Sequence, residues 1–254
     1  MHVRESFNLT GKKAFITGGT NEIGKTVAQA FAEVGADVAI VDMDLEEARK
    51  FALELEEFGI RSIGLQTDVS DPEEVDRMIG TILDEFGTID IAFNNASLCI
   101  TEKAETMSFE TWKRIIDINL TGIFLTAQAA GKVMIENGGG SIINTASMSG
   151  HIVNASQGQC AYNAAKAAVI QLTKSLAVEW APYNIRVNCI SPGYIDTEVV
   201  SESDEWRPVW EHLTPMNRRG KPEELSTAVL YLAGYGSSFT TGADLVIDGA
   251  FSSV

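Results

Sequence analysis

The sequence predicts an α/β protein in which helices cover both faces of a parallel sheet. Short runs rich in β-branched and aromatic residues, such as Lys13–Thr17, alternate with segments whose apolar residues recur at helical spacing. This alternation continues along the whole chain, as in successive strand–helix–strand units. The chain has 254 residues, 45% of them hydrophobic, which suits a large buried core. No linker or repeat interrupts it, so we expect one domain over 1–254.

Each expected strand is a short apolar run bounded by turn or capping residues. The seven strands are Lys13–Thr17, Val38–Val41, Ser62–Leu65, Ile89–Phe93, Ser141–Thr145, Ile185–Ile190 and Asp244–Ile247. The helices begin after capping residues or at proline, and they end before glycine or proline. They are Gly24–Val34, Leu45–Phe58, a helix between Ser70 and Gly87, Ser108 to about Asn137, Gly158–Trp180 and Pro222–Ala233. The long irregular stretch that remains, about 196–220, is expected to be a functional loop.

Composition and charge exclude several partners. The net charge of −16 leaves no basic footprint for nucleic acid, and it disfavours anionic membranes and acidic carrier proteins. No run approaches about eighteen uncharged apolar residues, and Met1–Thr10 carries charges, so we expect no membrane span, no signal segment and a cytoplasmic protein. The three cysteines and three histidines are scattered, so reduced thiols and no metal site are expected.

A glycine turn joins the first strand to the first helix. Such a turn presents backbone N–H groups and a positive helix end to a pyrophosphate. By itself it is weak evidence, because many such turns only connect two elements. The candidate pyrophosphate-binding residues are Gly18, Asn21, Glu22, Ile23 and Gly24.

Asp42 ends the second strand, eighteen residues after Gly24. A carboxylate there can accept hydrogen bonds from ribose hydroxyls, and it repels a 2′-phosphate. The neighbouring Asn21, Met43 and Asp44 are not basic, so NAD is expected in preference to NADP. The alternative interpretation of Asp42 is a solvated strand end or a helix cap.

Tyr162 and Lys166 are four residues apart within a predicted helix, so the phenol and the ammonium share one face. A nearby positive charge lowers the pKa of a phenol, which would make Tyr162 a proton donor and acceptor near neutral pH. This spacing is common in proteins and gains its weight from the motifs around it.

The chain resembles the short-chain dehydrogenase/reductase family, in its compact branch, from Gly11 to Gly249. The shared motifs, in the family's order, are the glycine turn, Asp68-Val69, Asn94-Asn95-Ala96, Asn119, Ser147, Tyr162 with Lys166, and Pro192-Gly193. The resemblance implies a single doubly wound Rossmann-type domain with a parallel seven-stranded sheet. It also implies a nicotinamide-dependent oxidoreductase that acts on CH–OH groups, and a homotetramer.

The resemblance further implies a role for each matching residue. Tyr162 would be the general acid/base, and Lys166 would lower its pKa and hold the nicotinamide ribose. Ser147 would orient the reacting oxygen, and Asn119 would anchor a relay water. The remaining cofactor contacts would be Asp68 and Val69 at the adenine, Asn94 and Ala96 near the nicotinamide ribose, and Pro192, Gly193, Ile195 and Thr197 at the nicotinamide. For Asp68 a turn or cap is an alternative, and Asn94 and Asn119 could serve structure alone.

Three departures from the family's pattern suggest where this chain is individual. Glu22 stands where the family usually has glycine, and its carboxylate would repel a pyrophosphate. Ser97 also replaces a usual glycine. The segment Ile152–Gln159 lengthens the family's usual gap between Ser147 and Tyr162 and is rich in amides. We therefore expect a small alcohol or ketone substrate, with substrate contacts at Ser97, Ser149, Asn154 and Gln157.

The amides, and a similarity of Tyr162–Lys166 to sugar-alcohol- and ketose-acting members, favour a polyol/ketose substrate. The amides could instead only cap a surface loop. The stretch 196–220, with Trp206 and Trp210, is expected to form a substrate lid. Alternatives are a 3-oxoacyl-carrier-protein-type reductase, another alcohol dehydrogenase of the family, and a non-catalytic dinucleotide sensor, which would not need Ser147, Tyr162 and Lys166.

Overall fold

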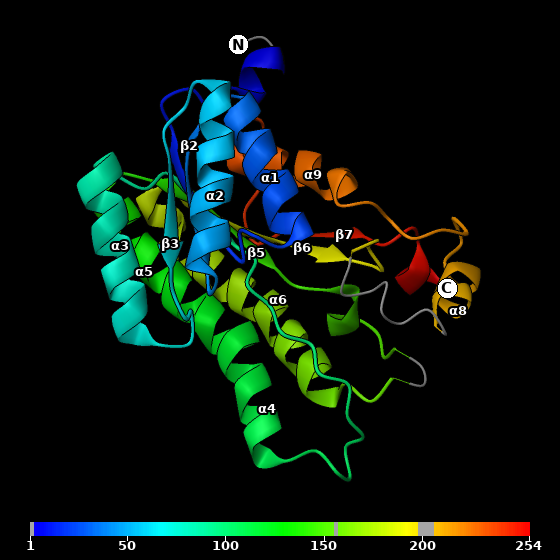
Figure 1. Ribbon diagram of the computed structural model, residues 1–254. Helices are drawn as coiled ribbons and strands as arrows, with labels where there is room; N and C mark the ends of the chain where they lie inside the picture. Colours follow the sequence, from blue (N-terminus) through cyan, green and yellow to red (C-terminus); the bar gives the residue numbers. More distant parts are fainter. Residues whose placement is uncertain (1–2, 155–156, 198–205) are drawn as a thin grey trace.

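A computed structural model describes residues 3–154, 157–197 and 206–254 (Figure 1). Its seven strands form one sheet in the order β3-β2-β1-β4-β5-β6-β7, and every neighbouring pair is parallel. The strands are β1 (Lys13–Thr17), β2 (Asp37–Asp42), β3 (Ser62–Gln66), β4 (Ile91–Asn94), β5 (Gly140–Thr145), β6 (Ile185–Pro192) and β7 (Asp244–Ile247). The predicted doubly wound parallel sheet is confirmed.

Helices cover both faces of the sheet, as its buried strands require (Figure 1). Side chains of α1, α2 and α9 pack on one face, in a core that contains Phe31, Phe51 and Leu232. Side chains of α3, α5 and α6 pack on the other, around Met78, Ala130 and Leu176. The bounds are α1 (Glu22–Glu33), α2 (Leu45–Leu55), α3 (Pro72–Phe86), α4 (Phe109–Ile116), α5 (Gly122–Asn137), α6 (Cys160–Trp180), α8 (Arg207–Leu213) and α9 (Glu223–Ala233).

The predicted helix from Ser108 to Asn137 contains an irregular turn. Its backbone changes to a π-helix over Asp117–Thr121, between α4 and α5. A π-turn inside a helix often marks a functional site, and this one holds Asn119. The helical run Phe109–Asn137 has the length and hydropathy of a membrane span, but 56% of its most apolar window is buried, as in the core helix of a soluble protein.

Other boundaries also differ from the sequence prediction. Helix α1 begins at Glu22 because the side chain of Asn21 caps it, accepting from the Gly24 N–H. Strand β4 is shifted to Ile91–Asn94, and α6 begins at Cys160. Within the stretch predicted as irregular, the short helix α8 buries Trp210. Trp206 directly precedes α8, while 198–205 of the predicted lid lie outside the described residues.

The site follows from the topology. Strands β2 and β3 lie on one side of β1, and β4 to β7 lie on the other. The carboxyl ends of β1 and β4 are neighbours, with Thr17 paired to Asn94. In open α/β sheets a crevice forms at this reversal of strand order. The first glycine turn and the segment after β4 therefore meet at one edge of the sheet.

Candidate active site

The turn after β1 leaves backbone bare at the N-terminus of α1. A Cβ on Gly24 would lie 2.2 Å from the carbonyl oxygen of Gly18, and Gly18 has a φ of +60°. The turn opens on a cleft of about 560 Å³. A helix N-terminus with exposed N–H groups suits a pyrophosphate, so this cleft fits a dinucleotide. Its lining includes Gly18, Asn21, Glu22, Asp42, Met43, Asp68, Val69, Ala96 and Ser97.

Asp42 is held at this cleft by two backbone groups. Its carboxylate oxygens accept from the N–H groups of Thr20 at 3.0 Å and Met43 at 2.8 Å. The structure corrects one premise of the sequence argument, because Lys25 and Arg114 also line the cleft. They come from α1 and α4 and could not be seen as neighbours of Asp42 in the sequence. Lys25 forms an ion pair with Glu47 at 2.6 Å.

Asn95, directly after β4, holds the glycine turn by hydrogen bonds. Asn95 donates to the carbonyl oxygen of Gly18 and to Oδ1 of Asn21. Thr17 Oγ1 accepts from the backbone N–H groups of Asn95 and Ala96. Asn94 is fully buried and donates to Asn144 on β5, so its contact with a cofactor stays a prediction. The roles of Thr17 and Asn95 were missed, because their register appears only once β1 and β4 are paired.

The predicted proton-transfer residues meet at the carboxyl end of β5 and on α6. Lys166 is fully buried, and its Nζ donates to the carbonyl oxygen of Thr145 at 2.7 Å. The same Nζ lies 5.5 Å from the ring centroid of Tyr162. Ser147 begins the turn after β5, with its Oγ accepting from the N–H of Ser149. One helix and one strand end thus bring Ser147, Tyr162 and Lys166 together.

Burial dominates the electrostatics of this group. It raises the pKa of Tyr162 to about 12, opposed by hydrogen bonding from Ser147 and Ser97. It also lowers the pKa of Lys166 to about 7. The expected lowering of the Tyr162 pKa is therefore not found, because loss of hydration outweighs the favourable contacts. The two shifts bring the pKa of the lysine, and not that of the tyrosine, near neutrality.

Asn119 is buried in the π-turn with both ends of its amide bonded. Its Nδ2 donates to the carbonyl oxygens of Leu98 and Ile115, and its Oδ1 accepts from the Ser97 hydroxyl at 2.7 Å. The serine that replaces the usual glycine thus joins Asn119 to the neighbourhood of Tyr162. The predicted relay water of Asn119 stays a prediction.

The predicted substrate residues Ser149, Asn154 and Gln157 belong to one polar cluster, which also contains Gln159 and Tyr194. Gln159 donates to Asn154 Oδ1 at 2.6 Å and reaches Ser149 Oγ at 3.5 Å. The Tyr194 hydroxyl bonds both Asn154 and Gln157. Ser149, Asn154 and Gln159 are each less than a tenth exposed. Tyr194 and Gln159 were not among the predicted site residues, although Gln159 was noted in the amide-rich segment.

The segment after β6 borders the polar cluster through Tyr194. Pro192 ends β6, and a Cβ on Gly193 would lie 2.6 Å from Asp248 Cα, which explains the glycine there. Ile195 forms a β-bridge with Gly220, so the two ends of the predicted lid are joined. Thr197 is the last described residue before the gap. Contacts of these residues with a nicotinamide stay predictions.

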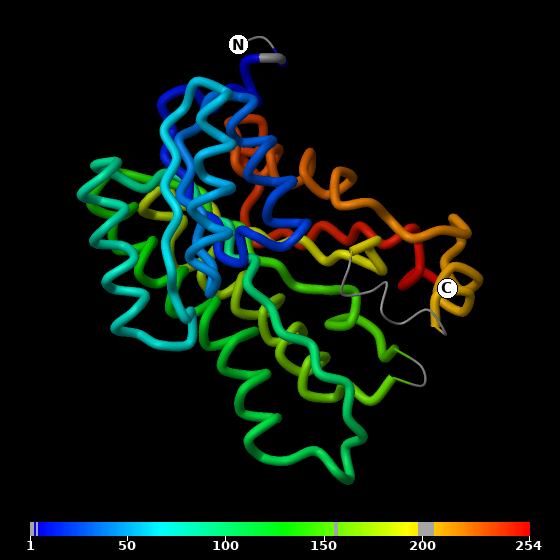
Figure 2. The backbone as a smooth tube through the Cα atoms, viewed as in Figure 1, coloured from blue at the N-terminus to red at the C-terminus, as the bar shows by residue number. Residues whose placement is uncertain are grey.

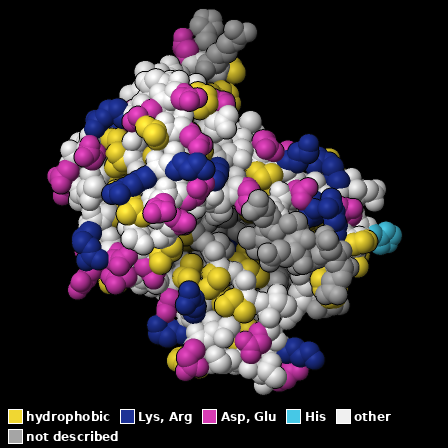
Figure 3. Space-filling view, viewed as in Figure 1, with side chains coloured by type: hydrophobic (Ala, Val, Ile, Leu, Met, Phe, Trp, Pro, Cys, Tyr) yellow, Lys and Arg dark blue, Asp and Glu magenta, His cyan; other side chains and the backbone are white. Residues whose placement is uncertain are grey.

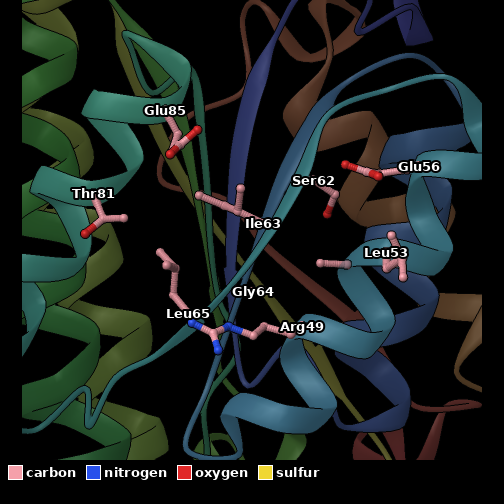
Figure 4. Close-up of a pocket in the computed structure, with 10 residues that line it drawn as sticks. Arg49, Leu53, Glu56, Ser62, Ile63, Gly64, Leu65, Thr81 and Glu85 are labelled. Carbon is pink, nitrogen blue, oxygen red and sulfur yellow. The ribbon is translucent and has the colours of Figure 1, made fainter.

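Another pocket lies along the edge strand β3 (Figure 4). It is lined from α2, β3 and α3 by side chains that include Arg49, Leu53 and Glu85, and it holds no predicted site residue. Among the residues that the structure describes, no three His, Cys, Asp or Glu side chains gather as a metal site would need. On the face shown in Figure 3, acidic and basic side chains are interspersed.

A glycine turn at a helix N-terminus, together with a tyrosine and a buried lysine and serine, defines a nicotinamide-dependent oxidoreductase. A family model described as enoyl-(acyl carrier protein) reductase matches residues 18–252. The chain belongs to the short-chain dehydrogenase/reductase family, and it is an oxidoreductase that acts on alcohol groups.

Relatives and solved structures match the chain over nearly its full length. It is 43% identical to sorbose reductase SOU1 of Candida albicans over 99% of this chain and 90% of that one. It is also 43% identical to a probable NADP-dependent mannitol dehydrogenase of Yarrowia lipolytica, over 98% and 91%. A short-chain dehydrogenase/reductase structure from Mycobacterium marinum superposes with a TM-score of 0.96 at 46% identity, covering 98% and 99%. The chain is thus similar to polyol-acting members of its family.

Proposed function

We propose that this protein interconverts a secondary alcohol of a neutral polyol and the corresponding ketose, with NAD as the cofactor. The observation that carries the substrate class is the polar cluster of Ser149, Asn154, Gln157, Gln159 and Tyr194, of which Ser149, Asn154 and Gln159 are buried. It adjoins the catalytic serine, since the Ser149 N–H donates to Ser147 Oγ. Buried amides in this position suit a chain of hydroxyl groups. The names of the relatives support the same class.

The residues divide the chemistry among them. When bound, the nicotinamide ring supplies or accepts the hydride. Tyr162 removes the hydroxyl proton during oxidation and returns it to the carbonyl oxygen during reduction. Ser147 donates a hydrogen bond to that oxygen and fixes its position. Lys166, buried beneath the phenol, holds the ribose hydroxyls and passes the proton onward.

The preference for NAD rests on Asp42. Two backbone N–H groups hold its carboxylate at the cleft, where it suits the 2′- and 3′-hydroxyls and repels a 2′-phosphate. Lys25 and Arg114 favour the opposite choice, and the mannitol dehydrogenase relative is named NADP-dependent. We give more weight to Asp42, because Lys25 is already paired with Glu47.

The test is an absorbance assay of reduced nicotinamide with pentitols, hexitols and simple secondary alcohols, each offered NAD and NADP. We expect polyol turnover with NAD that Tyr162→Phe abolishes. Asp42→Ala is expected to raise kcat/KM for NADP relative to NAD by roughly tenfold or more. Polyol turnover that prefers NADP in the parent protein would refute the role of Asp42. Turnover of hydrophobic alcohols alone would refute the substrate class, while tight NAD binding without any turnover would favour a dinucleotide sensor.

We also propose a homotetramer, as the family resemblance suggests. The resemblance implies that the two long helical segments, Phe109–Asn137 and Cys160–Trp180, form one interface and that the C-terminal strand β7 forms another. Large apolar side chains are exposed on these helices, and Val246 is exposed on β7. The exposed side chains on the helices are Phe109, Trp112, Phe124 and Val178. Light scattering of the purified protein tests this, and a monomer would refute it.

A further inference from the structure

Hydrogen bonds in the polar cluster run in one direction. The Cys99 thiol lies 3.7 Å from Gln159 Oε1, and Gln159 Nε2 donates to Asn154 Oδ1 at 2.6 Å. Asn154 Nδ2 then donates to the Tyr194 oxygen at 2.9 Å. Tyr194 donates its single proton to Gln157 Oε1 at 2.8 Å. Aligned bonds of this kind polarise one another, so the series acts as a unit.

The series ends at Gln157, whose Nε2 group has no acceptor among the described residues. With its Oε1 bonded to Tyr194, the carboxamide of Gln157 has a fixed orientation, and its two Nε2 protons are left over. Within 3–154, 157–197 and 206–254, no hydrogen bond from Gln157 Nε2 is found. Gln157 is partly exposed, whereas Asn154 is buried with both ends of its amide bonded. Of these two predicted substrate contacts, only Gln157 therefore has an amide N–H group available to donate to a ligand.

Aromatic packing holds the Tyr194 ring in place. The ring stacks on Trp210 of α8, with centroids 4.5 Å apart, and it meets the edge of Phe251 at 5.3 Å. Figure 2 shows that the C-terminal end of the chain lies beside the segment that forms α8. Three distant parts of the chain thus fix one phenol oxygen. A ring held on two sides cannot swing to follow a different partner.

We propose that Tyr194 is a specificity-determining residue that orients Gln157 to donate a hydrogen bond to a substrate hydroxyl beyond the reacting carbon. This inference rests on the proposed polyol function and extends it. A hydroxyl group of a polyol can accept a hydrogen bond from the Gln157 amide, whereas an alkyl chain would bury that amide without an acceptor. Sites built around such a donor reject substrates that lack the partner more strongly than apolar pockets reject size changes.

The test compares a pentitol with 2-pentanol, which keeps one secondary alcohol and lacks the other hydroxyls. Tyr194→Phe removes the hydroxyl and keeps the ring that packs on Trp210. We expect kcat/KM for the pentitol to fall roughly 10- to 100-fold, mainly through KM, because the contact exists before and during reaction. The value for 2-pentanol should change by less than about threefold. Gln157→Leu should repeat this pattern, and the double variant should be no worse than either single one.

Tyr231→Phe is the matched control. Tyr231 lies on α9, and its hydroxyl is hydrogen-bonded to Thr240 Oγ1 at 2.9 Å. Both residues are far from the amide series in the chain, so Tyr231→Phe should affect neither substrate. Unfolding midpoints show whether each variant is folded. Equal losses on both substrates, no loss on the pentitol, or additive losses in the double variant would each overturn the inference. If the parent protein oxidises 2-pentanol but no polyol, the proposed function fails and this inference fails with it. If the parent oxidises polyols and Tyr194→Phe does not discriminate, the inference alone fails.

Discussion

Replacing the buried lysine should stabilise the protein while removing its activity. Burial lowers the Lys166 pKa from 10.5 to about 7. Below pH 7 Lys166 is protonated in both the folded and the unfolded state. Burial of its charge then lowers the free energy of unfolding by the full cost, about 5 kcal/mol. Between these two pKa values unfolding takes up a proton, so the cost shrinks as pH rises and disappears above 10.5. Lys166→Met removes the cost but leaves the Thr145 carbonyl unpaired, which destabilises by about 1–3 kcal/mol.

The informative quantity is how the difference in free energy of unfolding between Lys166→Met and the parent protein changes with pH. Urea unfolding of parent and variant, at one protein concentration, should give a net stabilisation of about 2–4 kcal/mol at about pH 6. At about pH 9 the advantage should be smaller by about 3 kcal/mol, whatever the lost hydrogen bond costs, because that loss is the same at both pH values. Lys174→Met, on the exposed side of the same helix, is the control and should show no such pH dependence. A stability difference that is equal at the two pH values would refute the reasoning.

Three further outcomes follow from the site. Alcohol oxidation needs the Tyr162 phenolate, and burial raises the pKa of Tyr162 to about 12. The oxidation rate should therefore rise from about pH 7 to about pH 10, whereas the rate of ketone reduction should not change over this range. Steady-state rates in both directions test this, and an oxidation rate that levels off near neutrality would contradict it. Gly24→Ala places a Cβ 2.2 Å from the Gly18 oxygen, so it should weaken NAD binding by more than about tenfold and destabilise by about 1–3 kcal/mol, as calorimetry and denaturation would show. Gly80→Ala, with open space around it, should be neutral or stabilising. Glu22→Gln removes a carboxylate from the cleft and should tighten NAD binding a few-fold at low salt and less at high salt, and unchanged affinity at low salt would count against the electrostatic argument.

Alternation of strands and helices was enough to predict the fold, because a parallel sheet needs crossover helices and buries both of its faces. The starts of α2 and α3 were predictable from Asp44 and from the run Ser70-Asp71-Pro72. In the structure the Asp44 carboxylate accepts from one N–H group of the first turn, and that of Asp71 accepts from two. Boundaries were less predictable. The π-turn at Asp117–Thr121 leaves no mark in the apolar spacing, and α8 is too short to show a helical period.

Within the site, a sequence motif predicts which residue is present but not which groups surround it. Tyr162 and Lys166 were found from their spacing, yet the direction of the tyrosine pKa shift depends on burial that only packing determines. Lys25 and Arg114 reach the cofactor cleft from helices remote from Asp42 in the chain. Tyr194 gave no signal, because its role depends on contacts with residues far from it in the sequence.

Two of the departures from the family's pattern, Glu22 and Ser97, line one cleft. Glu22 lies at the cofactor end, where it changes the charge that a pyrophosphate meets. Ser97 and, in the amide-rich segment, Asn154 lie near Ser147 and Tyr162, where they bond Asn119 and Tyr194 respectively. Proton transfer requires only the catalytic residues, whereas affinity and selectivity come from what flanks them. We therefore expect this chain to differ from its relatives in the cofactor and the alcohol or ketone that it binds, and to share with them the reaction common to the family.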